Sequence, residues 1–129
     1  MAMSGSLSHN FYGGYHLIMD WTAQHNVMAN TSTVTVTLKL KVDPGWSLQV
    51  SSRSGTYVEI DGTRKTFTAP AVSSSGGTTH TLGTVSHTVN HDSGGYKTLT
   101  LKAYYFFNAT IGGTYVEKAE FSRAITLDK

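Results

Sequence analysis

The ten residues TVTVTLKLKV, from Thr33 to Val42, alternate strictly between polar and apolar side chains. A period of two is typical of a β-strand with one face in the core and the other in solvent, whereas an amphipathic helix needs a period near 3.6. Valines and leucines make up the apolar side, and threonines and lysines make up the polar side. The stretch therefore predicts a half-buried strand and argues against a helix.

The same alternation recurs along the rest of the chain. It runs from Tyr15 to Ala23 and resumes at Trp46 after the break at Asp43-Pro44-Gly45. Asp61-Gly62 predicts a two-residue hairpin turn, and a shift of parity near Gly83 predicts a β-bulge. The remaining segments alternate between strands and turns. Strands are expected over 56–69 on both sides of the hairpin turn, over 78–89 and over 99–107, and a final strand or pair of strands over 115–127. Between them lie a polar loop from Pro70 to Gly77 and a turn at Gly112-Gly113.

About eight strands with turn signals between them, and no amphipathic helix, predict an all-β fold. The expected architecture is an antiparallel β-sandwich of immunoglobulin-like or jelly-roll-like type, and a small closed barrel is the alternative. We expect residues 1–129 to form a single domain, in which residues 1–10 form a loosely packed arm.

Composition argues against several classes of function. Only 14% of the residues are charged and the formal net charge is +2, so a phosphate-binding basic surface is not expected, and nucleic acid is not an expected partner. The chain has no cysteine, and no stretch approaches the roughly 20 apolar residues of a membrane-spanning helix. The segment MAMSGSLSHN lacks the basic and apolar regions of a signal peptide, which predicts a soluble protein made in the cytoplasm of the producing cell without a Sec-type signal, so that any action outside a cell requires release by something other than secretion.

The segment NHDSGGYK, from Asn90 to Lys97, contains the Asp-Ser-Gly-Gly of chymotrypsin-like proteases. His91 stands where those enzymes have an oxyanion glycine, and 129 residues hardly supply two barrels. We therefore interpret the segment as a turn in which Asp92 and Ser93 bond local backbone and both glycines take positive φ, and expect no catalytic residue. His87 and His91 lie about 13 Å apart on an extended strand, too far to share an ion, so no metal site and no cofactor are predicted.

Aromatic residues are the more promising signal for binding, at 11% of the chain. Trp21 shares a face with Leu17 and Met19 and is expected in the core. Exposed aromatics on a β-sheet stack on sugars or pack against other subunits. The candidates for such a role are Trp46, Tyr57, Tyr104 and Phe106, with His91 and Tyr96 as contacts from the NHDSGGYK loop.

Four segments carry a family resemblance: GYHLIMDWTAQHNVMANTSTVTVTLKLKV, IDGTRKTFT, VNHDSGGYKTLTLKAYYF and GGTYVEKAEFSRAITLD. They resemble a family of minor structural proteins, of unknown function, from siphophages of Gram-positive bacteria. The resemblance spans nearly the whole chain. It implies a β-sandwich protein of the virion, associated with the tail or baseplate or decorating the particle. Family members are often longer, so the resemblance leaves open a short homologue and a module of a longer virion protein.

Two hypotheses of function follow. The first is a non-enzymatic structural module of the virion, located on the particle, with other virion proteins as partners and a homo-oligomer expected. The alternative is a carbohydrate-binding module that recognises host cell-wall glycans through the aromatic candidates. Neither hypothesis requires a cofactor or a membrane.

Overall fold

The computed structural model describes residues 2–127, and every regular element within that range is a β-strand. The strands follow the chain in this order: β1 (Ala2–Tyr12), β2 (Tyr15–Asn26), β3 (Thr31–Val42), β4 (Leu48–Val50), β5 (Arg53–Ile60), β6 (Thr63–Ala69), β7 (Val72–Ser74), β8 (Thr78–Asn90), β9 (Lys97–Tyr105), β10 (Ala109–Ile111), β11 (Thr114–Val116) and β12 (Ala119–Leu127). The prediction of an all-β fold is confirmed.

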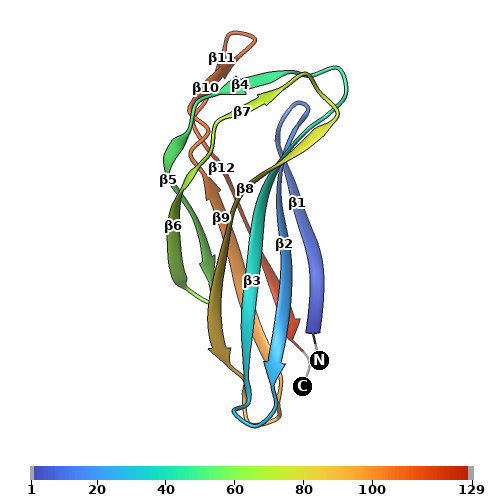
Figure 1. Ribbon diagram of the computed structural model, residues 1–129, viewed down its shortest axis with the longest axis vertical. Coiled ribbons are helices and arrows are strands. Elements are labelled where there is room, and N and C mark those ends of the chain that lie inside the picture. Colours follow the sequence, from blue (N-terminus) through green and yellow to red (C-terminus); the bar gives the residue numbers. More distant parts are fainter. Residues whose placement is uncertain (1, 128–129) are drawn as a thin grey trace.

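Eight of these strands form two four-stranded antiparallel sheets, with the orders β1-β2-β3-β8 and β12-β9-β5-β6. The four short strands form two further pairs, β4 with β7 and β10 with β11, which lie together at the upper end of the elongated molecule in Figure 1. The opposite end carries the β2–β3 turn and the β8–β9 loop. The two ends are therefore built from different segments and offer different surfaces.

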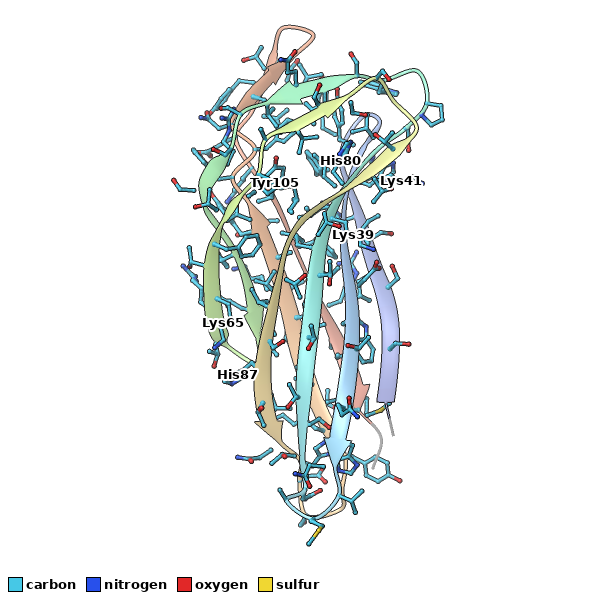
Figure 2. All side chains as sticks on the ribbon, viewed as in Figure 1. Lys39, Lys41, Lys65, His80, His87 and Tyr105 are labelled. Atoms are coloured by element: carbon cyan, nitrogen blue, oxygen red, sulfur yellow. The ribbon has the colours of Figure 1, made fainter. Side chains whose placement is uncertain are left out.

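The two four-stranded sheets share one hydrophobic core. In β3, the valines and leucines predicted to face inward are fully buried. The threonines on the outward face of β3 form side-chain hydrogen bonds with threonine and serine hydroxyls of β8. Trp21 is 8% exposed, as predicted for a core residue. The largest buried side chains at the upper end are Tyr15, Tyr105 and Phe107, and Figure 2 shows Tyr105 in the upper half of the molecule.

The local predictions of turns and of the bulge hold, including the turn at Gly112-Gly113, which joins β10 to β11. Asp61 and Gly62 both have positive φ (53° and 84°), as a two-residue hairpin turn of this type requires. In β8 the pairing with β3 shifts between Gly83 and Thr81, so Leu82 is the extra residue of a bulge.

The number of strands is larger than the predicted eight. Twelve strands lie within residues 2–127, because four three-residue strands form in segments rich in turn residues. One of them, β7, lies inside the stretch 70–77 that was predicted as a loop. The alternation that resumes at Trp46 did predict β4, whereas β7 and β10 have too few residues for a two-residue period to be recognised in the sequence.

The predicted arm over residues 1–10 is not what the structure shows for residues 2–10. These residues belong to β1, which pairs with β2 from Ala2↔Gln24 onward. Apolar residues at positions 3, 7 and 11 point toward the core, and serines at positions 4, 6 and 8 are exposed. The same alternation is present in the sequence of β1, but glycine and serine occupy many of its positions. Both are weak strand formers, so the segment did not read as a strand.

Candidate functional site

An open groove of about 690 Å³ lies at the upper end of the molecule, between the β4–β7 pair and β10. Trp46 and Tyr15 contribute aromatic rings to it, and Ala109 and Ile111 contribute apolar side chains from β10. Uncharged polar side chains make up much of the remaining lining: Ser47, Gln49, Ser73, Ser74 and Thr110. We call this site the Trp46 groove.

Trp46 is held in position by the β1–β2 hairpin. A Cβ atom added to Gly13 would lie 2.5 Å from the six-membered ring, and one added to Gly14 would lie 2.3 Å from Cδ1 of the five-membered ring. The indole therefore rests along the backbone of both glycines, and no side chain could occupy that space. The Tyr15 ring approaches the indole edge to face at 5.5 Å. Trp46 remains 37% exposed, so part of the anchored ring is free to meet a ligand.

Tyr15 connects the floor of the groove to the core. Its hydroxyl donates a hydrogen bond to the carbonyl oxygen of Ser47, which fixes the start of β4. Its ring also packs against Phe11 and Phe107. Burial raises the pKa of the Tyr15 hydroxyl above its ordinary value, and the nearby Tyr12 adds to that shift. The hydroxyl thus stays a neutral donor under ordinary conditions.

Arg53 supports the wall that carries β10. Its Nε donates to the carbonyl oxygen of Phe107 at 3.1 Å, one terminal nitrogen donates to the carbonyl oxygen of Asn108 at 3.1 Å, and the other donates to the Ser51 hydroxyl. Asn108 also accepts a hydrogen bond from the Tyr115 hydroxyl at 2.6 Å. The guanidinium is therefore a structural support, and the described lining holds no other charged side chain. Such a groove suits a neutral ligand with many hydroxyl groups.

A second depression of about 530 Å³ adjoins the groove and shares Gln49, Val50 and Ser73 with it. The shared residues belong to β4 and β7, so this strand pair borders both depressions.

Tyr57 and Tyr104 lie elsewhere, on the outer face of the β12-β9-β5-β6 sheet. They are cross-strand neighbours whose rings stack at 5.0 Å with an interplanar angle of 3°. The guanidinium of Arg64 lies 3.8 Å from the centre of the Tyr57 ring, and the Lys118 ammonium lies 5.8 Å from that of Tyr104. Tyr57 is only 9% exposed, so the ring has no free face for a sugar. The pair stabilises the sheet surface.

Phe106 is half-buried just after the end of β9 and does not line the Trp46 groove. Of the four predicted aromatic candidates, the structure thus brings only Trp46 to a concave site. Sequence reasoning missed Gly13, Gly14 and Tyr15. The Gly-Gly-Tyr sequence at a hairpin is a usable signal in retrospect, because paired glycines often permit a close approach by a large ring.

The NHDSGGYK loop lies at the end opposite the groove. One carboxylate oxygen of Asp92 accepts hydrogen bonds from the backbone N–H groups of Gly94 (2.9 Å) and Tyr96 (3.0 Å). Gly95 has φ +85°, whereas Gly94 does not take the positive φ that was predicted for both glycines. Ser93 is exposed. The interpretation of this segment as a turn held by Asp92 agrees with the structure, whereas the side-chain hydrogen bond predicted for Ser93 is not formed with any of residues 2–127.

His91 is buried at 8% exposure, and so it is not the loop-tip contact that the sequence predicted. Its Nδ1 lies 2.8 Å from the carbonyl oxygen of Gly95, so this nitrogen carries the proton, and Nε2 accepts from the fully buried hydroxyl of Ser32 at 2.6 Å. Its ring stacks on His25 at 4.4 Å. The imidazole closes this end of the core, while Tyr96 is 45% exposed.

Within residues 2–127 no group of three or more His, Asp or Glu side chains is placed to hold a metal ion. The same residues include no helix that is long and apolar enough to cross a membrane.

Comparisons of the chain with protein-family models, with curated proteins and with solved structures give no match. The fold and the site therefore define the class of protein: it is all-β and antiparallel, with an open groove at one end. The groove is lined by an anchored tryptophan and by polar side chains that are uncharged apart from Arg53.

Proposed function

We propose that this chain is a non-enzymatic module of a bacteriophage particle, built as an immunoglobulin-like or jelly-roll-like β-sandwich. The family resemblance of four segments supports this proposal. Two of the motifs that carry it, Ile-Asp-Gly-Thr and His-Asp-Ser-Gly-Gly, coincide with turns that join long strands. The module works in several copies on the tail, baseplate or particle surface, alongside other virion proteins.

Particles provide the test of this location. Mass spectrometry and immunoelectron microscopy of purified virions are expected to find the chain at a fixed position and in a fixed copy number. A chain that is made during infection but is absent from purified particles contradicts the proposal.

We further propose that the Trp46 groove binds carbohydrate of the host cell wall. One observation carries this function: an indole anchored on two glycines faces a groove whose polar side chains are neutral apart from Arg53, which is engaged in hydrogen bonds to backbone carbonyls and Ser51. Sugars combine apolar ring faces with many hydroxyl groups, so they match a flat aromatic ring beside amide and hydroxyl side chains. The adjoining depression extends the site enough for an oligosaccharide.

Binding to purified host cell walls tests the groove, with the protein displayed on beads so that weak sites are detected by avidity. Trp46→Ala is expected to lower retention at least tenfold, which is the effect of losing one stacking ring. Gln49→Ala and Thr110→Ala are expected to lower it less without disturbing the indole. Tyr96→Ala is the matched control, because Tyr96 is an exposed aromatic that does not line the groove and belongs to the loop at the opposite end of the molecule. Equal retention of the Trp46 and Tyr96 variants contradicts a carbohydrate site in the groove.

A further inference from the structure

Trp46 is carried by a turn, Asp43-Pro44-Gly45-Trp46, that lies between β3 and β4 at the upper end of the molecule (Figure 1). The Trp46 N–H donates to the carbonyl oxygen of Asp43 at 3.2 Å, and Gly45 has φ +86°. Proline at the second position and a glycine with positive φ at the third are typical of a type II β-turn. The direction in which the indole leaves the backbone therefore depends on how Asp43 is held.

Asp43 is held through its N–H, its carbonyl oxygen and its carboxylate. The N–H donates to the carbonyl oxygen of Gly14 at 2.8 Å, and the carbonyl oxygen accepts from Trp46. One carboxylate oxygen lies 2.9 Å from Nε2 of His16. Because a carboxylate can only accept, Nε2 of His16 carries a proton and donates it in this hydrogen bond. Gly14 is also a glycine on which the indole rests, so Asp43 joins the turn to the strand that supports its tryptophan.

The turn is also packed against the loop that joins β7 to β8. A Cβ atom added to Gly76, in that loop, would lie 2.5 Å from the carbonyl oxygen of Trp46 and 3.0 Å from that of Asp43. Backbone meets backbone in this contact. The carboxylate of Asp43 is therefore a support of the turn that a substitution can remove while the main chain keeps its contacts.

The pair of Asp43 and His16 is partly open to solvent. The His16 side chain is 26% exposed and the Asp43 side chain is 34% exposed. Ion pairs with this degree of exposure contribute little to the free energy of unfolding. Removal of the Asp43 carboxylate is therefore expected to leave the chain folded, so its effect on Trp46 can be measured separately from stability.

We propose that Asp43 is a positioning residue of the Trp46 groove, whose carboxylate, held by His16, fixes the turn and with it the angle of the indole. Neither Asp43 nor His16 lines the groove, so both act through Trp46. A ring that is already fixed at one angle loses little freedom when a sugar stacks on it, and such preorganisation raises affinity. The inference rests on the proposed binding of carbohydrate and explains how that site is ordered.

Fluorine NMR of the chain labelled with 5-fluorotryptophan tests the position of the indole without a ligand. The two tryptophans give two resonances, and that of Trp46 is the one lost in Trp46→Phe. Asp43→Ala is expected to shift or broaden the Trp46 resonance and to leave that of the buried Trp21 in place, which reports an intact core. Asp43→Asn keeps an oxygen that accepts from His16 and suits the first position of the turn, so it is expected to restore the native resonance.

Retention on host cell walls measures the consequence for binding. Asp43→Ala is expected to lower retention about threefold to fivefold, which is less than the effect of Trp46→Ala, because the ring is kept but is less ordered. His16→Ala is expected to give the same loss. The double variant is expected to lose no more than either single variant, because both changes remove the same contact. Asp43→Asn is expected to be retained like the native chain.

Asp20→Ala is the matched control. Asp20 forms an ion pair with Lys39 at 2.7 Å, and the two side chains are 38% and 32% exposed, so the change removes a pair of similar exposure. Asp20 lies in β2, as His16 does, and on the same face of the sheet. This variant is expected to leave the Trp46 resonance and the retention on cell walls unchanged.

A Trp46 resonance that does not respond to Asp43→Ala overturns the inference, and so does an equal response to Asp20→Ala. Failure of Asp43→Asn to restore the resonance also overturns it. If Trp46→Ala lowers retention and Asp43→Ala does not, the inference is wrong and the carbohydrate site stands. If the resonance responds as expected but the native chain does not bind cell walls, the proposed carbohydrate site alone is contradicted.

Discussion

Gly14→Ala tests the support of Trp46 with a single methyl group. The added Cβ atom would lie 2.3 Å from Cδ1, 2.4 Å from Cγ and 2.6 Å from Nε1 of the Trp46 indole. Carbon atoms in contact are normally about 3.5–4.0 Å apart, so the ring has to move by more than about 1 Å. Gly14 does not have positive φ, so the backbone itself accepts alanine. The expected cost is that of overpacking, about 2 kcal/mol of unfolding free energy.

A double-mutant cycle in guanidinium unfolding separates this clash from other effects. In the Trp46→Ala background the ring is gone, and Gly14→Ala is expected to be neutral or to stabilise by up to about 0.5 kcal/mol, because alanine restricts the unfolded chain. In the native background the same change is expected to lower Tm by about 8 °C for a domain of this size. The Trp46 groove is expected to lose ligand affinity in parallel, since the indole is displaced.

Gly94→Ala is the control for this cycle. Its Cβ atom would meet its nearest neighbour, the Asp92 carboxylate, at 3.4 Å, and Gly94 lacks positive φ, so the expected change is within about 0.5 kcal/mol. If Gly14→Ala costs the same with and without Trp46, the indole does not rest on that glycine and the geometry of the groove is wrong.

Three further predictions concern stability. Burial raises the pKa of Tyr105 to about 12, whereas an unfolded tyrosine ionises near 10, so the free energy of unfolding falls by about 2–3 kcal/mol as the pH rises from 10 to 12. Tyr105→Phe is expected to lack this loss when unfolding is measured as a function of pH. The same variant is expected to gain about 1 kcal/mol at pH 7, because the Tyr105 hydroxyl has no hydrogen-bond partner within residues 2–127. Asp92→Ala is expected to lower the free energy of unfolding by about 1–2 kcal/mol through two lost backbone hydrogen bonds, whereas Ser93→Ala is expected to change it by less than about 0.5 kcal/mol. A larger loss for Ser93→Ala contradicts the interpretation of this loop as a turn held by Asp92. Labelling of Ser93 by a fluorophosphonate also contradicts it. Ser32→Ala is expected to cost about 1–3 kcal/mol because it leaves His91 without its donor, and thermal melting that shows no change would mean that this bond is not formed.

The strands were predictable wherever a two-residue period extended over most of the strand. The stretch Thr33 to Val42 is the clearest case, because each inward residue is apolar and each outward residue is threonine or lysine. The hairpin turn at Asp61-Gly62 and the bulge at Gly83 were also predictable, since both rest on local backbone chemistry. The three-residue strands were predictable only in part: β4 continues the alternation that resumes at Trp46, and β10 pairs with β11 across the predicted Gly112-Gly113 turn. The strand β7 was not predictable, because its pairing with β4 joins segments far apart in the chain.

The candidate site was harder to predict, because exposure on a strand says nothing about what lies beside it. Tyr57 points outward as expected, but Tyr104 and Arg64 cover both of its faces. His91 sits in a polar loop, yet its ring turns inward to meet Ser32. The exposure of Trp46 could be expected from the turn that precedes it. Its support by Gly13 and Gly14 could not, because this contact joins segments about 30 residues apart in the chain.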